Sequence, residues 1–365
     1  MKKIILILSL LFSLFGLYAN DTYFFMAGGQ LVPTKEGNVD VEMSEEIINI
    51  ILNPKDYEIT VDFSFYNYGK DISLEIGFPF FCLGIGGEGT ISDFKCWTND
   101  VETSYTDYPL KKNWSSNEPT ELENAYVRTI KFPSKKTTKT RISYKATYGC
   151  EAPSYNIAKY LYGTGSSWKN SIGKMTVRIQ SNLIYNSPIH LSLPKENLMK
   201  RVSDNVWEAV YTNIEPESYT DCITIILGDI FGDTGPRVLH KDRFVPCNVK
   251  LTKQSLFWYT KPQLRLLRNA IYAFNGYPFK SKDLIELFEV KCAEYGWFGF
   301  KKIDGDYKGY YPLDKNFSED KLSDIEKHNV KLILEEEKSR QKVINIDNSF
   351  LISQVGPVSI CENGI

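Results

Sequence analysis

The stretch "YEITVDFSF", residues 57–65, decides the fold class, because apolar and polar residues alternate along it without a break. Its apolar members are Tyr57, Ile59, Val61, Phe63 and Phe65, and its polar members are Glu58, Thr60, Asp62 and Ser64. A period of two turns one set toward a core and the other toward water. The stretch therefore predicts a β-strand with one buried face.

The same alternation recurs along the first two thirds of the chain. It is found in "YVRTIKF" (126–132), "RISYKATY" (141–148), "MTVRIQ" (175–180) and "WEAVYT" (207–212), whereas "CITIILG" (222–228) is apolar on both faces and is expected to be central. Strands separated by turn residues predict an antiparallel β-sandwich-like domain over residues 20–240. One short helix is expected within it at "SYNIAKYLYG", with Ser154 as N-cap and Gly163 as the stop.

The pattern becomes helical after a connection at residues 241–261, which leaves room for one more strand. A first helix is expected from Pro262 to Gly276, a second from Ser281 to near Gly296, and a third after Ser318. The fold class is therefore mainly β plus α: a sandwich-like domain followed by a small three-helix domain over residues 262–340. The tail, residues 341–365, is weakly patterned.

The N-terminus has the features of a secretory signal peptide over residues 1–19. Lys2 and Lys3 precede an apolar run from Ile4 to Leu17, and cleavage is expected after Ala19. An uncleaved anchor is the less favoured alternative, because the run is short for a membrane span. We expect a periplasmic or secreted protein without an integral membrane segment after cleavage.

Composition excludes some classes of function. The net charge is −2 and no long basic stretch occurs, so no nucleic-acid partner is expected. The seven cysteines include no C-x-x-C pair, which argues against a zinc or redox motif. Cys82 and Cys96 flank a glycine-rich stretch and are predicted to form a disulfide across a hairpin, while the other cysteines are expected to be buried thiols.

Short motifs that could indicate chemistry are better explained as turns. "GIGGEG" (84–89) matches a dinucleotide loop but is followed by a strand-like stretch rather than a helix. "GTGSSW" (163–168) departs from the serine elbow, and the acidic turns lack a calcium-loop ligand set. We therefore predict no catalytic residue, no metal site and no cofactor.

One loop carries a group of aromatic residues that can serve two purposes. Its candidate binding residues are Trp297, Phe298, Tyr307, Tyr310 and Tyr311. Rings beside glycines can present a platform for a sugar or a peptide. The favoured alternative is that these rings fill the core of a short helical unit.

The helical part resembles the YARHG domain family, a module of exported bacterial proteins. Tyr272, Ala273 and Gly276 match the naming motif, while Phe274 and Asn275 replace its arginine and histidine. The resemblance covers residues 262–340, and Tyr272, Ala273 and Gly276 are expected to act structurally. Residues 20–235 resemble an uncharacterised bacterial domain-of-unknown-function family, which implies an exported β-rich domain.

The favoured hypothesis is an exported, non-enzymatic protein of the cell envelope or the medium. Its helical module would dock to a surface component, either a cell-wall glycan or an envelope protein. The alternative is an envelope hydrolase with a carboxylate-based site in the β domain. A purely structural protein is a third possibility.

Overall fold

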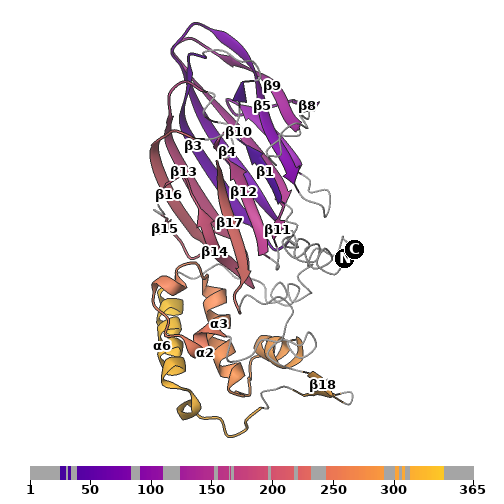
Figure 1. Cartoon of the computed structure of the whole chain (residues 1–365), viewed down its shortest axis with the longest axis vertical. Coiled ribbons are helices and arrows are strands. Elements are labelled where there is room, and N and C mark those ends of the chain that lie inside the picture. The colour runs from indigo at the N-terminus through magenta and orange to yellow at the C-terminus, as the bar shows by residue number, and fades with distance from the viewer. Residues whose placement is uncertain are drawn as a thin grey trace, which may run out of the picture.

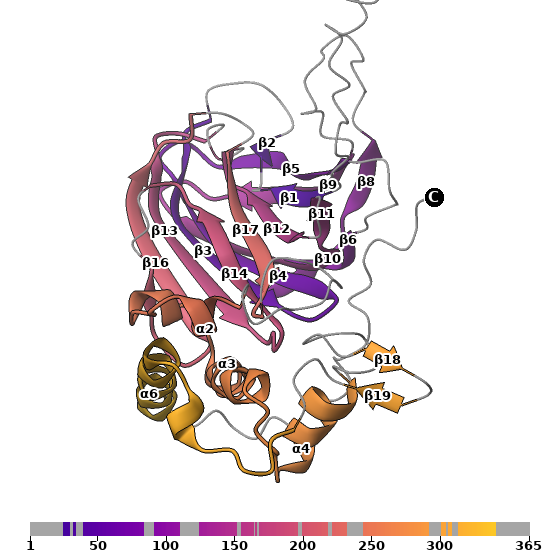
Figure 2. The same ribbon diagram turned by 60° about the horizontal axis from the view of Figure 1, so that its bottom comes forward.

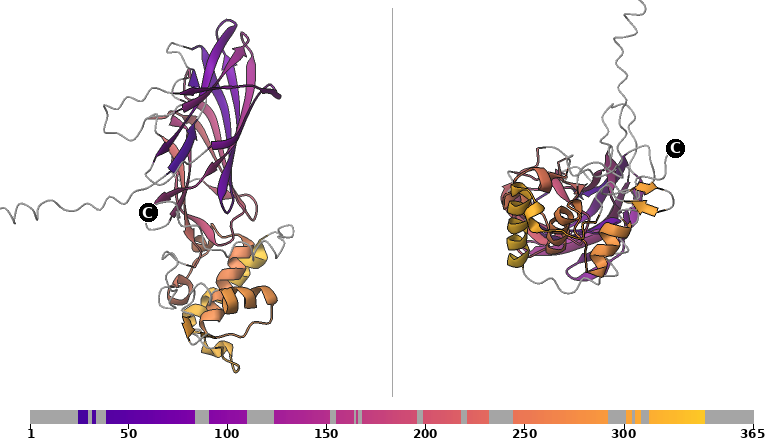
Figure 3. Two further views of the ribbon diagram at one scale, coloured as in Figure 1. Left: turned by 90° about the vertical axis from the view of Figure 1, so that its right-hand side faces the viewer. Right: turned by 90° about the horizontal axis from the view of Figure 1, so that it is seen from below.

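Two β-sheets packed face to face carry a helical unit at one end (Figure 1). The computed structural model describes residues 25–29, 32–33, 39–83, 91–109, 124–151, 155–163, 165, 168–195, 199–217, 221–231, 244–291, 301–303, 306–308 and 313–340. The helical unit extends the long axis of the molecule beyond the sheets (Figure 3).

The first sheet has the strand order β14-β17-β12-β1-β5-β9-β8, with β11 paired to β12 and β2 paired to β5. Its strands are β1 (Phe25–Gly29), β2 (Val32–Pro33), β5 (Ile72–Leu83), β8 (Thr106–Pro109), β9 (Asn124–Phe132), β11 (Gly149–Glu151), β12 (Tyr155–Leu161), β14 (Asn186–Ser192) and β17 (Cys222–Asp229).

The second sheet has the order β15-β16-β13-β3-β4-β10-β6-β7. Its strands are β3 (Val41–Leu52), β4 (Asp56–Asn67), β6 (Ile91–Thr98), β7 (Val101–Thr103), β10 (Thr137–Thr147), β13 (Ile172–Ser181), β15 (Lys200–Arg201) and β16 (Val206–Ile214).

The alternating stretch at residues 57–65 forms most of β4, at the centre of the second sheet, as its pattern predicts. Tyr57, Val61 and Phe65 are fully buried between the sheets. Most strand pairs are antiparallel, as expected, but β1 pairs with β12 and β13 pairs with β3 in parallel. These parallel pairs join strands far apart in the sequence, so local patterning does not reveal them.

The helix predicted at "SYNIAKYLYG" is wrong, because residues 155–161 form strand β12. This strand pairs with β17 on one side and with β1 on the other. Ile157 and Tyr160 are buried. Pairing on both sides satisfies the backbone, and this tertiary context overrides the local helix signals.

The disulfide predicted between Cys82 and Cys96 is also wrong. Cys82 lies on β5, opposite Met26 of the first sheet, whereas Cys96 lies on β6 of the second sheet. The two strands therefore do not form the expected hairpin. Cys96 is a buried free thiol whose Sγ donates to the carbonyl oxygen of Thr103 at 3.2 Å.

The helical unit contains the three predicted helices and several short elements. Its elements are α2 (Val245–Asn248), η3 (Gln254–Leu256), α3 (Lys261–Phe274), α4 (Lys282–Leu284), the π-helical η4 (Ile285–Lys291), the strands β18 (Lys301–Ile303) and β19 (Asp306–Lys308), η6 (Glu319–Lys321) and α6 (Asp324–Ser339). The third helix begins after Ser323 rather than Ser318, which caps only the one-turn η6.

The stretch expected to be a connection contributes to the core of the helical unit. Phe244 and Leu256 are fully buried there, and η3 and α2 replace the additional strand. Within the described ranges, no helix combines the length and the apolar character that a bilayer crossing requires.

Candidate functional site

The YARHG-like motif forms the end of α3. Gly276 has a φ of 77°, and its N–H donates to the carbonyl oxygen of Ala273 at 3.0 Å. The N–H of Tyr277 donates to the carbonyl oxygen of Tyr272 at 3.1 Å. Glycine adopts this left-handed conformation without a side-chain clash, so Gly276 turns the chain out of the helix.

Tyr272 holds the segment that precedes α6 against the end of α3. Its hydroxyl donates to Glu319 Oε1 at 2.8 Å, and its ring lies 5.5 Å from that of Tyr277 and 6.0 Å from that of Phe317. Partial burial, together with the carboxylate of Glu319, raises the pKa of Tyr272 to about 12. The tyrosine is therefore a neutral hydrogen-bond donor at ordinary pH.

The two positions that depart from the naming motif both make contacts inside the helical unit. Phe274 is 2% exposed, and its ring lies 5.0 Å from that of Phe244. Asn275 Nδ2 donates to the Ile271 carbonyl oxygen at 2.8 Å and to Glu326 Oε1 at 2.9 Å. Glu326 is buried near the start of α6, so Asn275 ties the end of one helix to the beginning of the other.

The predicted aromatic loop is described only at its hairpin. Tyr307 lies on β19, opposite Lys302 of β18. Trp297, Phe298, Tyr310 and Tyr311 lie outside the described residues. Figure 2 shows β18 and β19 at the margin of the helical unit, beyond α4.

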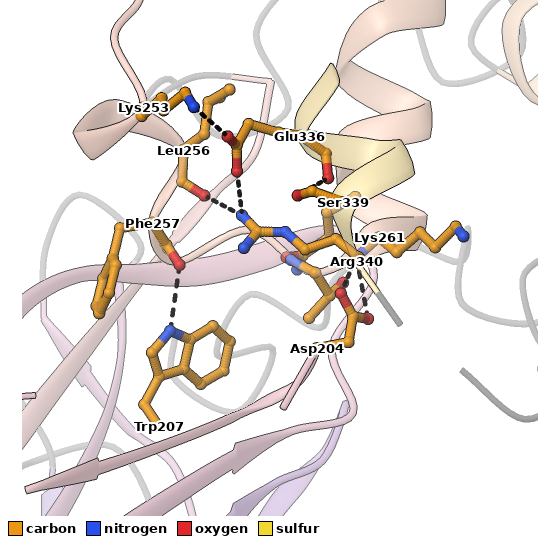
Figure 4. A network of polar contacts seen from close by, with 11 residues as sticks. Asp204, Trp207, Lys253, Leu256, Phe257, Lys261, Glu336, Ser339 and Arg340 are labelled. Atoms are coloured by element: carbon orange, nitrogen blue, oxygen red, sulfur yellow. Dashed lines mark hydrogen bonds and ion pairs between the residues drawn. The ribbon is translucent and has the colours of Figure 1, made fainter. Parts of the chain in front are cut away.

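Polar contacts join the helical unit to the sandwich (Figure 4). The indole Nε1 of Trp207, on β16, donates to the carbonyl oxygen of Phe257 at 3.1 Å. The N–H of Lys261 donates to both carboxylate oxygens of Asp204, at 3.0 and 3.1 Å. Burial raises the pKa of Asp204. This carboxylate from the sandwich occupies the N-terminus of α3, where the helix dipole favours negative charge.

Gln263 makes the N-terminal cap of α3 part of the junction. Its Oε1 accepts from the N–H of Thr260 at 2.9 Å. Its Nε2 donates to the carbonyl oxygens of Leu183 at 3.1 Å and Asn186 at 2.7 Å. One buried side chain therefore both starts the helix and binds the sandwich.

Arg340 joins the end of α6 to η3. Its Nη2 donates to the Leu256 carbonyl oxygen at 3.1 Å and lies 3.5 Å from Glu336 Oε2. Leu256 directly precedes Phe257, whose carbonyl oxygen receives the bond from Trp207. The two contacts place α6, η3 and β16 in one continuous arrangement (Figure 4).

Apolar packing crosses the junction in both directions. The core of the helical unit includes four sandwich residues, namely Ile184, Tyr185, Ile230 and Phe231. Phe257 and Trp258 in turn pack against the sandwich core, and the Trp258 ring lies 5.2 Å from that of Trp207. The helical unit is therefore built onto the sandwich rather than attached by a free linker.

The structure has a second candidate site that the sequence pattern does not predict. It is a hollow of about 420 Å³ on the outer face of the second sheet. Its lining residues are Glu45, Ile47, Asp62, Phe63, Ser64, Trp97, Asp100, Lys139, Thr140 and Arg141. Asp62 and Ser64 belong to the polar set of the opening stretch, which correctly predicts an outward face. The pairing of β4 with β3 and β10, and of β10 with β6, brings the rest together, and single-strand patterns do not reveal that pairing.

Metal-binding chemistry has no visible basis in the part of the chain that the structure describes. No group of three or more histidine, cysteine, aspartate or glutamate side chains gathers there in an arrangement able to hold a metal ion.

Solved structures resemble this chain at low sequence identity, and they include the following three. A Legionella pneumophila protein with the provisional name nutrient binding protein is 20% identical and aligns over 87% of this chain and 99% of its own, with a TM-score of 0.47. The M1 zinc metallopeptidase of Deinococcus radiodurans is 9% identical over 54% of this chain and 44% of its own, with a TM-score of 0.29. Yeast LTA4 hydrolase is 11% identical over 57% of this chain and 34% of its own, with a TM-score of 0.31. Likenesses at this level assign no activity to this chain.

The sequence comparisons concern the helical unit alone. No curated protein matches the chain. A family model described as YARHG domain matches residues 247–338, which confirms the resemblance and extends it back to the second half of α2. Residues 247–338 of this chain therefore form a YARHG domain.

Proposed function

We propose that this chain is an exported, non-enzymatic protein of the cell envelope or the medium. Its YARHG domain docks to a surface component, either a cell-wall glycan or an envelope protein. The signal-peptide pattern of residues 1–19 supports export. The shared core at the junction supports the docking role, because it fixes the orientation of the YARHG domain on the sandwich.

A domain fixed at its base presents its outer surface in one orientation. Asp204, Trp207 and Gln263 bond the base of the YARHG domain to the sandwich, and Phe231 inserts between the two parts. Preorganisation of this kind lowers the entropy lost on binding, because the domain does not have to be immobilised at that moment. The sandwich then acts as a rigid holder.

The hairpin β18–β19 is the part of the domain that we assign to contact. It lies at the margin of the helical unit (Figure 2) and pairs Lys301 with Lys308 and Lys302 with Tyr307. Lysines attract anionic groups of envelope polymers at long range. A tyrosine adds flat apolar area with a polar tip, which suits both sugars and proteins.

The experiment uses the full mature chain, because deletion of the YARHG domain would expose Ile184, Tyr185, Ile230 and Phe231. One variant combines Lys301→Glu, Lys302→Glu and Lys308→Glu. Retention on purified cell-wall sacculi and on membrane fractions is then measured by co-sedimentation. We expect the wild-type chain to sediment with one of the two fractions and the triple variant to remain in the supernatant.

A matched variant controls for net charge. It combines Lys70→Glu, Lys131→Glu and Lys136→Glu, three exposed lysines at the end of the sandwich farthest along β4 from the junction. Retention of this variant at the wild-type level would support docking through the hairpin. Equal retention of both triple variants, or no retention of the wild-type chain on either fraction, would contradict it.

A further inference from the structure

We propose that the hollow on the outer face of the second sheet is a binding site for a neutral saccharide. This inference concerns the sandwich and is independent of docking by the YARHG domain. It rests on a preformed concavity, a tryptophan in its wall, and charged side chains that are already held in ion pairs.

The hollow is built from rows of side chains that cross four strands. Ile47 on β3, Asp62 on β4, Arg141 on β10 and Trp97 on β6 lie opposite one another in successive pairs. A second row contains Glu45, Ser64 and Lys139. Neighbouring side chains on one face of a sheet are close enough to contact a single ligand. The residues converge because of strand register.

The backbone departs from regular strand geometry at both ends of the hollow. The pairing of β3 with β4 shifts at a β-bulge between Met43 and Glu45, and Ser44 Oγ donates to the Ser64 carbonyl oxygen at 2.9 Å. At the other end, Asn99 and Asp100 turn β6 into β7 with positive φ values of 47° and 64°. Bulges bend a strand and re-aim its side chains, and they are frequent beside functional sites. The backbone conformation at the bulge and at the turn therefore shapes the hollow.

The charges around the hollow balance when Lys174 of the adjacent strand β13 is included. Its carboxylates belong to Glu45, Asp62 and Asp100, and its cations belong to Lys139 and Arg141. Arg141 Nε lies 2.6 Å from Asp62 Oδ1, and Lys174, on the adjacent strand β13, lies 3.0 Å from Glu45 Oε1. A charged ligand would have to compete with these ion pairs. A neutral ligand can use them as fixed donors and acceptors.

A saccharide satisfies the remaining features of the hollow. Its hydroxyl groups both donate and accept, which matches carboxylates beside a guanidinium and an ammonium. The C–H face of a sugar ring can lie on the indole of Trp97, whose body is apolar and whose N–H is polar. The hollow lies in the middle of a sheet, where no free strand edge offers backbone pairing to an extended peptide. Its volume of about 420 Å³ lies within the usual range of small-molecule sites.

The test fills the hollow without weakening the strand. Ser64→Trp places a large ring in the lining, at a strand position where aromatic residues are well tolerated. Thr60→Trp is the matched control, because Thr60 lies on the same strand and face but outside the lining. Binding of maltotriose, cellotriose and chitotriose, each up to about 10 mM, is measured by saturation-transfer NMR and titration of tryptophan fluorescence. A heparin disaccharide serves as the charged probe.

The expected result is that at least one neutral trisaccharide binds the wild-type chain and Thr60→Trp alike. Ser64→Trp should weaken that binding by at least about tenfold, and circular dichroism should show an unchanged fold. Absence of binding by all three neutral probes would overturn the proposal, as would binding that Ser64→Trp leaves intact or binding of the heparin probe alone. The hairpin variant Lys301→Glu, Lys302→Glu, Lys308→Glu should keep saccharide binding, which separates this site from the docking role.

Discussion

Among single residues, Gly276 shows how a family motif can be a structural device. Its φ of 77° lies in the left-handed region, where a side chain clashes with the backbone. The preceding Asn275 bonds to the buried Glu326, and Tyr272 bonds to Glu319. The motif therefore ends α3 and fastens the segment that leads into α6.

Replacing Gly276 by valine should strain this turn. We expect a loss of unfolding free energy on the order of 1–2 kcal/mol, because a β-branched side chain disfavours the left-handed conformation. Gly276→Asn is the control and should cost distinctly less, since asparagine tolerates positive φ. Urea denaturation of the three proteins measures the difference. Equal stability of the valine and asparagine variants would show that the conformation of this turn is not limiting.

Gly173 supports the β-bulge beside the proposed saccharide site. A Cβ atom at this position would lie 2.6 Å from the carbonyl oxygen of Ser44, which belongs to the bulge. Because that neighbour is backbone, Gly173→Ala should lower the unfolding free energy by about 1–3 kcal/mol. At Gly69 the nearest atom would be the side-chain Cβ of Asp40 at 3.1 Å, so Gly69→Ala should cost less. If thermal melts of the two variants coincide, the close approach does not constrain β13.

Asp229 should make stability depend on pH. Burial raises its pKa from 3.8 to about 7, while its Oδ1 accepts from the N–H of Phe231 at 2.7 Å. The folded chain holds this proton more tightly than the unfolded chain. The unfolding free energy therefore falls as pH rises from 3.8, the ordinary pKa of the carboxyl, to about 7, its pKa in the folded chain. Asp229→Asn should remove that slope and raise stability at pH ~8 by on the order of 1–2 kcal/mol. Denaturation midpoints at a series of pH values check this, and an unchanged slope would refute it.

Among the elements, α6 is preceded by two serines, Ser318 and Ser323, that could each cap its N-terminus. Ser323 and Glu326 form a capping box, with Ser323 Oγ accepting from the Glu326 N–H at 3.2 Å. Ser318 is a plausible cap from sequence, but it serves only the one-turn η6. Ser323→Ala should therefore lower the unfolding free energy by about 1 kcal/mol, and Ser318→Ala by clearly less. The opposite order in urea denaturation would place the start of the helix at Ser318.

Elements with a strong local pattern could be predicted, and those set by distant partners could not. The alternation at residues 57–65 predicts β4, and the spacing of Leu264, Leu267 and Ile271 predicts α3. Strand β12 carries helix-like caps, yet its pairing with β17 and β1 decides its structure. The hollow could not be predicted for the same reason. Trp97 and Asp62 lie on strands that both pair with β10, and the sequence does not show that pairing.

In the whole molecule, the YARHG domain and the sandwich share one base. The sequence suggested two modules separated by a connection, because residues 241–261 carry no strong period. In the structure, Phe244 and Leu256 from that stretch are fully buried, and Phe231 from the sandwich lies 6.4 Å from Phe244, ring to ring. A large apolar contact of this kind disfavours relative motion of domains. We therefore infer that the chain unfolds as one cooperative unit.

Native-state hydrogen exchange at increasing urea concentration tests this cooperativity most directly. It reports the free energy of opening for each slowly exchanging amide. If the two parts share one core, the most protected amides of α3 and α6 should converge on the same opening free energy as those of β4 and β13. The result that would contradict this structure is exchange of α3 and α6 through a lower-energy opening while the strands stay protected.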